Sequence, residues 1–314
     1  MGTAVQLTLE GTAESQVNVI ENECQAGVPA ESTSTTSTGK RAIRIAAIGD
    51  LHVRDEAPPG VAAALQEVAP QVDLLVIAGD ITEGGRLPEA ELAVSLLGDI
   101  AIPKAAVLGN HDRRGPRRVA FRKLIESAGI TLLDGDAFVH QLPDGKRVGF
   151  AGVGGYGGGF WPEEDPHVPG ARLSKAVGMR ARREANRLEA ALLSLDRQRL
   201  DAIIVLMHYA PTTSTLGGEP VLKYWMLGNS LLGRVIDEHN VDLVIHGHAH
   251  LGNQFGRTPG GTPVRNVAMQ VTGGIMVYDV ERGKRIETVP DLSIRLDPVT
   301  VSSSDNRDPG ARAR

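Results

Sequence analysis

Side chains of the types that bind metal ions follow five short apolar runs in this chain. One fragment, Gly109-Asn110-His111-Asp112, comes directly after the apolar run 105–108. Histidine nitrogens combined with carboxylate and amide oxygens suit divalent first-row metals such as manganese, iron, zinc and nickel. The other four fragments have the same arrangement: Gly49-Asp50-Leu51-His52, Gly79-Asp80, His208, and His246-Gly247-His248-Ala249-His250. If the five fragments meet in space, they form a site for two divalent metal ions.

Each fragment taken alone also has a structural explanation. Gly-Asp and Gly-Asn pairs are common at turns, and a single histidine after a strand is more often a structural residue than a ligand. The fragment 246–250 is the most specific, because three histidines in five residues have little structural purpose. All five fragments follow predicted strands at their carboxyl ends, where open α/β sheets bind ligands. One shared site therefore explains them better than five coincidences.

Apolar runs and helical patterns alternate around these fragments, which predicts βαβ units and a mainly parallel sheet. Between 130 and 153 we expect three successive strands that form an antiparallel portion, with turn residues at 143–146. Strands are expected at 43–48, 72–78, 105–108, 130–133, 137–142, 147–153, 203–207, 243–245, 264–268, 274–280 and 286–289. Helices are expected at 61–68, 88–97, 119–128, 171–197 and 231–239.

The composition is that of an ordinary globular protein. Of the 314 residues, 41% are hydrophobic and 23% are charged, so a sizeable core is expected. We expect one domain over 41–300, with a disordered tail at 1–40, where Ser and Thr crowd residues 30–39, and another at 301–314. The single cysteine, Cys24, excludes an intramolecular disulfide.

Charge and hydropathy limit the partners. With 33 Lys and Arg against 38 Asp and Glu, the chain carries a formal charge of −5, so nucleic acid is not expected as a partner. No apolar run reaches the roughly 18–20 residues that span a bilayer, so no membrane association is expected. The N-terminus has no secretory signal pattern, and a cytoplasmic location is expected.

The five fragments together resemble the motifs of the calcineurin-like metallophosphoesterase superfamily. Their order and spacing match the family over about residues 43–280. The resemblance implies a four-layer α/β/β/α sandwich of two mixed β-sheets flanked by helices, with a dinuclear metal centre at one edge. The antiparallel portion expected at 130–153 fits that architecture better than a doubly wound sheet.

The resemblance also implies a role for each matching residue. One divalent metal would be held by Asp50, His52 and His250, and the other by Asn110, His208 and His248, with Asp80 bridging the two. His111 would face the leaving-group oxygen. Asp112 would either orient that imidazole or face solvent as a turn residue. His246 has no implied role and is expected to be a structural histidine near the site.

The implied reaction is hydrolysis of a phosphoric mono- or diester by a hydroxide that bridges the two metals. The expected substrate is a small organic phosphate or a nucleotide, including a cyclic one. Alternatives are a nuclease or protein phosphatase of the same fold, or a non-catalytic scaffold, although the complete ligand set favours catalysis. The sequence does not indicate the oligomeric state.

Candidate substrate contacts flank the motifs. Arg113 and Arg114 would meet a phosphate or a ribose, unless the basic run 113–123 is only a solvated helix face. Tyr156, in the glycine-rich loop 152–159, would stack on a base together with Phe160 and Trp161, unless this loop is an ordinary flexible one. The apolar residues 222–227 are a flap beside the cleft, an interface, or ordinary core.

Overall fold

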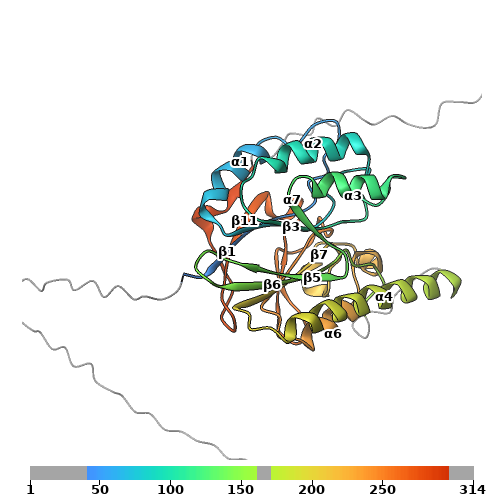
Figure 1. Cartoon of the computed structure of the whole chain (residues 1–314). Coiled ribbons are helices and arrows are strands. Elements are labelled where there is room, and N and C mark those ends of the chain that lie inside the picture. Colours follow the sequence, from blue (N-terminus) through green and yellow to red (C-terminus); the bar gives the residue numbers. More distant parts are fainter. Residues whose placement is uncertain (1–40, 161–170, 297–314) are drawn as a thin grey trace, which may run out of the picture. The chain divides into compact units, whose positions relative to one another are not determined.

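The computed structural model describes residues 41–160 and 171–296, except the side chains of 171–174. The predicted tails at 1–40 and 301–314, and Trp161, lie outside the described residues. Two β-sheets pack face to face in the described part, with helices on both outer faces (Figure 1). The four-layer α/β/β/α sandwich predicted from the sequence is therefore confirmed.

The first sheet has the strand order β12-β11-β1-β2-β3-β4, and β13 also pairs with β11. Strands β1 to β4 are parallel, and β11 runs antiparallel to β1. The bounds are β1 Ile43–Ile48, β2 Leu74–Ile77, β3 Lys104–Val107, β4 Ile130–Leu133, β11 Gly274–Val280, β12 Glu287–Thr288 and β13 Ile294–Arg295. The parallel strands β1, β2 and β3 consequently end at one edge, where their loops carry the predicted ligands.

The second sheet has the order β5-β6-β7-β8-β10-β9. Its four inner strands are parallel, and the outer strands β5 and β9 are antiparallel to their neighbours. The bounds are β5 Asp136–Gln141, β6 Arg147–Val153, β7 Ala202–Met207, β8 Leu243–His246, β9 Phe255–Arg257 and β10 Pro263–Asn266. Loops after β7 and β8 supply the remaining histidines.

Helices cover the two outer faces, with α1, α2 and α3 over the first sheet and α4 and α6 over the second (Figure 1). The helices are α1 Val61–Val68, α2 Leu87–Gly98, α3 Arg118–Glu126, α4 Ala171–Asp196, α5 Tyr224–Leu227, α6 Ser230–Asp237 and α7 Met269–Thr272. Short 3-10 helices lie at Ala69–Gln71, Thr213–Thr215, Val221–Lys223 and Pro290–Leu292. None of the described helices combines the length and the apolar character needed to cross a membrane.

Strand periodicity builds three layers of core. Because successive side chains of a strand point to opposite faces, Ile45 and Ala47 of β1 pack between the sheets, while Ala46 and Ile48 pack under the helices. Helix α4 packs its stripe of Leu188 and neighbouring apolar residues on the outer face of the second sheet. Both sheets are thus apolar on both faces and packed on both sides. Polar side chains are therefore found at the ends of the strands.

The expectation of one antiparallel portion over 130–153 is wrong in one respect. β4 is parallel to β3 in the first sheet, and only β5 and β6 form an antiparallel hairpin, in the second sheet. The chain crosses between the sheets at Asp134 and Gly135, and Gly135 has a φ of 91°. The sequence pattern missed this crossing because a two-residue turn can join strands of one sheet or of two.

Candidate metal centre

The residues predicted as metal ligands meet at the carboxyl ends of five strands. Three of the loops follow β1, β2 and β3 of the first sheet, and two follow β7 and β8 of the second. Side-chain atoms that suit a metal ion form three groups, each within 4.8 Å: Asp50, His52 and His250; His52, Asp80 and His111; and Asp80, His208 and His248. The convergence that the sequence predicted is therefore present in the structure.

The first group combines a buried carboxylate with two partly exposed histidines. His250 Nε2 lies 2.9 Å from Asp50 Oδ1, and His52 Nε2 lies 3.8 Å from the same oxygen. The backbone N–H of His248 also donates to the Asp50 carboxylate. Asp50 therefore ties the loop after β1 to the loop after β8, although the two are some 200 positions apart in the chain.

The second group lies deeper. His208 Nε2 is 3.3 Å from Asp80 Oδ2 and 3.0 Å from Asn110 Oδ1, and both Asp80 and His208 are almost completely buried. The rings of His208 and His248 are 4.7 Å apart. Asn110 thus joins this group through its amide oxygen.

Asp80 belongs to two of the three groups, and so does His52. His52 Nε2 is buried, lies 3.8 Å from both Asp50 and Asp80, and has no hydrogen-bond partner among the described residues. A buried imidazole nitrogen without a partner is costly unless something binds it. A cation between these oxygens and this nitrogen satisfies the orphaned atom, so the residues fit a metal centre with mixed nitrogen and oxygen ligands.

Hydrogen bonds on the far side of each ring fix which nitrogen faces the centre. His52 Nδ1 is 2.9 Å from Glu83 Oε2, and His208 Nδ1 is 2.9 Å from the carbonyl of Ala78. His248 Nε2 is 3.3 Å from the carbonyl of Met226. Such partners hold a ligating histidine in one tautomer and one orientation. His52 and His208 therefore present Nε2, whereas His248 presents Nδ1.

The electrostatics of the group match a site built for cations. Burial acts to lower the pKa of His208, but the Asp80 carboxylate overrides it and raises the pKa to about 9. Burial acts to raise the pKa of Asp80, and His208 reverses this, so that the carboxyl stays ionised. Burial lowers the pKa of His248 to about 3, and the charge of His208 adds to this effect. The centre thus keeps a buried carboxylate charged beside a neutral His248.

Backbone conformation sets four of the ligands apart. Among the described residues, the non-glycine positions with positive φ are Asp50 at 58°, His52 at 46°, Asp80 at 47° and His248 at 70°. Each side chain in this left-handed region costs free energy, and such residues gather at functional sites. All four are predicted metal ligands, so the strain is confined to the positions that aim side chains into the centre.

Three glycines leave the room that these side chains occupy. A Cβ at Gly109 would overlap the carboxylate of Asp80, and one at Gly247 would overlap that of Asp50. A Cβ at Gly79 would lie 2.7 Å from His208 Nδ1, and Gly79 also has a φ of 85°. The glycine before each of these ligands in the motifs therefore has a steric reason.

His111 lies at the rim of the centre. Its Nε2 is 3.9 Å from Asp80 Oδ2, and its ring contacts the ring of His52 edge to face, with 4.5 Å between centroids. Its Nδ1 lies 2.8 Å from the carbonyl of Glu83. Arg114 donates to Nε2 over 2.8 Å. His111 Nε2 consequently lies at the edge of the group of candidate ligands, next to the half-exposed guanidinium of Arg114.

The prediction that Asp112 orients the His111 imidazole is wrong, and so is the alternative that it faces solvent. Asp112 is 2% exposed, and both of its oxygens accept hydrogen bonds from the neighbouring loops. The donors are the backbone N–H groups of Ile81, Thr82 and Gly109 and the hydroxyl of Thr82, at 2.8 to 3.2 Å. Burial, with the nearby Asp80 charge, raises the pKa of Asp112 to about 6. Asp112 ties the Asp80 loop to the Asn110 loop.

Some of the predicted substrate contacts lie beside the centre and others do not. Arg114 lies beside the centre, but Arg113 forms an ion pair of 3.0 Å with Asp134 and packs against Gly154. Tyr156 lies between Arg180 and Tyr209, at 4.5 Å and 5.9 Å, and Tyr209 lies 4.3 Å from His248. Tyr156 is thus one ring removed from the ligands. Phe160 is 1% exposed, so the expectation that it stacks on a base is wrong.

His246 has the structural role that was expected. It is completely buried, and its Nε2 lies 2.9 Å from the hydroxyl of Thr215. Burial lowers its pKa to about 4, so the ring stays neutral. It supports the strand end from which His248 and His250 extend.

A cavity of about 450 Å³ opens beside the second group, and its wall contains Glu219 and Leu251, which the sequence reasoning missed, together with part of the run 222–227, for which a flap beside the cleft was one expectation. Lys223 and Glu219 are its charged residues, and Met226 and Leu251 belong to its apolar side. The remaining lining residues are Asn110, Tyr209, Leu227, His248 and His250. Part of the apolar run 222–227 is therefore a wall of the cleft. No spacing rule connects this segment with the motifs.

Glu83 was also missed. Its carboxylate lies 2.9 Å from His52 Nδ1 and 3.3 Å from His111 Nδ1. Burial acts to raise the pKa of Glu83, but the two histidines lower it, so the group stays ionised. Its place three residues after Asp80 was the available signal.

Comparison with known proteins agrees with this geometry. The sequence model of the calcineurin-like phosphoesterase family matches residues 43–252. No curated protein sequence matches the chain. Solved structures share the fold at low identity. TT1561 of Thermus thermophilus is 20% identical with a TM-score of 0.50, and the match covers 79% of this chain and 98% of that one. The phosphopantetheinyl hydrolase of Mycobacterium tuberculosis is 16% identical with a TM-score of 0.54, and the match covers 73% of this chain and 89% of that one.

The family match covers more than half of the chain and contains the strand ends that carry all seven predicted ligands. The two sheets and the flanking helices have the arrangement that the resemblance implied. The chain belongs to the calcineurin-like phosphoesterase family, whose members generally act as hydrolases on phosphate esters.

Proposed function

We propose that this protein hydrolyses phosphate esters of small organic molecules, nucleotides and cyclic nucleotides included, with two divalent metal ions. The observation that carries the proposal is the convergence of the seven predicted ligands at one edge of the two sheets, with His52 Nε2 orphaned among them and a cavity of about 450 Å³ alongside. A buried imidazole nitrogen without a partner is costly unless something binds it, and a metal ion between Asp50 and Asp80 would do so.

Asp50, His52 and His250 would hold one metal ion, and Asn110, His208 and His248 the other. Asp80 would contribute to both sites, since its Oδ2 lies 3.8 Å from His52 Nε2 and 3.3 Å from His208 Nε2. Such a pair supplies a Lewis acid for the phosphoryl oxygens and a nucleophile from water near neutral pH. Their donor set suits manganese, iron, zinc or nickel.

His111 would hold the proton that the leaving oxygen needs. With Nδ1 bound to the Glu83 carbonyl, a second proton on Nε2 points toward the ester oxygen. The Glu83 carboxylate, 3.3 Å from Nδ1, stabilises the imidazolium that carries this proton. In the structure the guanidinium of Arg114 is hydrogen-bonded to His111 Nε2, where the ester oxygen would lie. Its side chain is exposed enough to turn toward a phosphate oxygen instead.

The cleft wall supports a small substrate with an apolar part. Met226 and Leu251 would contact the organic group, and Lys223 would contact a second anionic group. The cavity volume lies within the range of sites for small molecules. Tyr209, whose pKa burial raises to about 12, stays protonated as a hydrogen-bond donor.

The test is a panel of mono-, di- and cyclic phosphate esters, run on protein loaded in turn with manganese, iron, zinc or nickel. We expect turnover of at least one small ester with two metals bound per chain. Two bound metals without turnover of any ester would support the scaffold alternative. Turnover of nucleic acid or phosphoprotein alone would support the macromolecular alternatives.

A matched pair of variants tests the substrate contact. Arg114→Gln should raise KM about tenfold, because a charge-assisted hydrogen bond to phosphate contributes about 1.5 kcal/mol or more. Arg118→Gln removes the same charge from an exposed position four residues later and should change nothing. Equal KM values in the two variants would show that Arg114 does not contact the substrate.

A further inference from the structure

A second cavity, of about 730 Å³, lies away from the metal centre. It is formed where β9 and β10 at the edge of the second sheet meet the segment around β12 at the edge of the first. It shares no lining residue with the cavity beside the metal ligands. The proposed hydrolysis does not use it.

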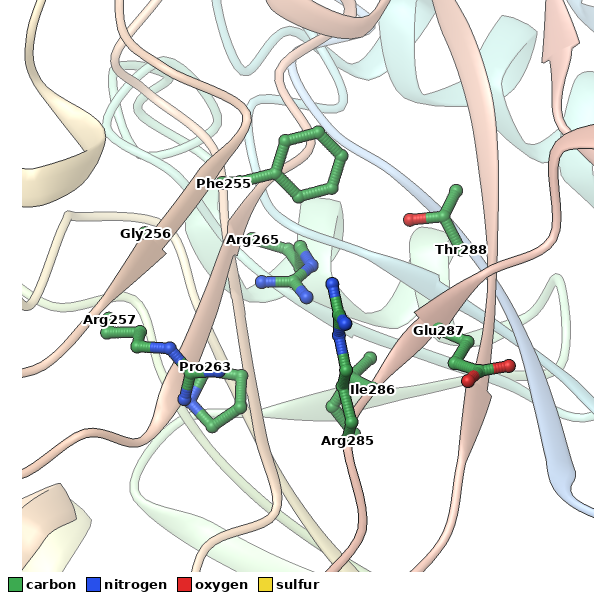
Figure 2. Close-up of a pocket in the computed structure, with 9 residues that line it drawn as sticks. All are labelled: Phe255, Gly256, Arg257, Pro263, Arg265, Arg285, Ile286, Glu287 and Thr288. Atoms are coloured by element: carbon green, nitrogen blue, oxygen red, sulfur yellow. The ribbon is translucent and has the colours of Figure 1, made fainter. Parts of the chain in front are cut away.

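Three arginines that are distant in sequence line this cavity: Arg257, Arg265 and Arg285. Figure 2 shows the guanidinium groups of Arg265 and Arg285 reaching toward one another at its centre. None of the three forms an ion pair with a carboxylate in the described part of the chain, although the protein as a whole is acidic. Glu287 is the acidic residue of the lining, and its carboxylate is turned away from the arginines (Figure 2).

Arg265 is the innermost of the three. Its guanidinium lies over the rings of Phe255, at 5.0 Å, and Tyr278, at 5.8 Å. Its Nε is buried without a hydrogen-bond partner among the described residues, and its Nη1 donates to the carbonyl of Val264. Burial lowers the pKa of Arg265, and the charges of Arg257 and Arg285 lower it further. A partly buried cation beside two like charges is unfavourable unless an anion joins it.

Phe255 supplies a second kind of contact. It is 52% exposed, although it is a large aromatic residue at the mouth of the cavity. One side of the ring lies against Arg265, and an exposed aromatic surface next to an arginine cluster suits a planar group. Arginine forks bind phosphate oxygens in pairs, so the cluster and the ring together suit a ligand with phosphates at one end and a ring at the other.

We propose that this cavity is a second binding site, which takes a nucleotide with at least two phosphates and binds them with Arg265 and Arg285 while Phe255 stacks on the base. The volume is within the usual range for a ligand of that size. The ligand joins the edges of the two sheets, because Arg265 comes from β10 and Arg285 from the segment before β12. Binding here is separate from hydrolysis at the metal centre.

A neighbouring pair of residues gives a matched test. Isothermal titration of the metal-loaded protein uses pyrophosphate, adenosine and the methylene-bridged analogue of ADP. We expect Arg285→Gln to weaken binding of the ADP analogue about tenfold at this site, since one charge-assisted contact is lost. Lys284→Gln removes the same charge from the adjacent exposed residue, which pairs with Glu281 and does not line the cavity. It should bind the analogue as the unmodified protein does.

Hydrogen exchange of the same samples locates the ligand. We expect the ADP analogue to protect peptides over 255–265 and 285–288, with protection lost in Arg285→Gln. Phe255→Leu should reduce the affinity for the analogue toward that for pyrophosphate. Protection confined to the metal-binding loops, or equal affinities in Arg285→Gln and Lys284→Gln, would overturn the site. Equal affinities for pyrophosphate and the analogue would overturn the nucleotide assignment.

Discussion

Replacing Asp112 with Asn should destabilise the protein more than it affects the chemical step. The carboxylate accepts four buried hydrogen bonds, so an amide NH2 group in place of one oxygen leaves two donors without an acceptor. At about 1–2 kcal/mol for each unsatisfied donor, we expect a loss of about 2–4 kcal/mol in the free energy of unfolding. That is a large share of the roughly 5–15 kcal/mol by which a folded domain is stable.

The assay is urea unfolding followed by circular dichroism in the presence of a chelator, so that bound metal does not contribute. Asp136→Asn serves as the control, because this carboxylate is exposed on β5 and its loss should change stability by about 0.5 kcal/mol or less. Metal affinity should also fall in Asp112→Asn, since the loops of Asp80 and Asn110 lose their connection. If stability is unchanged while kcat drops, Asp112 acts on the reaction and the structural argument fails.

Three further predictions concern the metal centre itself. His111→Ala should lower kcat about 100-fold or more through loss of the proton donor, while two metals per chain remain by elemental analysis; loss of both would make His111 a ligand. Asp80→Asn should leave fewer than two metals bound, and an unchanged stoichiometry would end its proposed bridging role. Metal binding at pH 8 should release a proton, because His208, with its pKa of about 9, is protonated before it binds the metal. The measurement is calorimetry of metal binding in buffers of different ionisation enthalpy. A binding enthalpy that does not depend on the buffer would contradict the prediction.

The strand ends and the convergence of the candidate ligands could be predicted because two independent signals agree there. A run of apolar residues marks a strand buried on both faces, and the polar residue that follows it has to emerge at the sheet edge. β1 with Asp50 and β7 with His208 are both of this kind. Even the preceding glycines belong to the pattern, since Gly79 and Gly109 clear the space for neighbouring loops.

The remaining parts depend on contacts between segments that no local pattern encodes. Asp112 follows His111 directly, and only the packing of the Asp80 loop decides that its carboxylate turns inward. β9 consists of Phe255, Gly256 and Arg257, which form no apolar run, so it was not predicted. The cleft wall at Met226 reaches the centre only because a short helix follows Lys223 there.

The division between the ligand loops and the cleft wall has a consequence for engineering. Gly79, Gly109 and Gly247 admit no larger side chain, so a variant library that includes them would consist mostly of inactive proteins. The side chains of Met226 and Leu251 are half exposed or more, and neither is a predicted ligand or proton donor. A library confined to such wall positions can change which ester enters while every ligand stays in place. Selectivity in this protein can therefore be redesigned without rebuilding its chemistry.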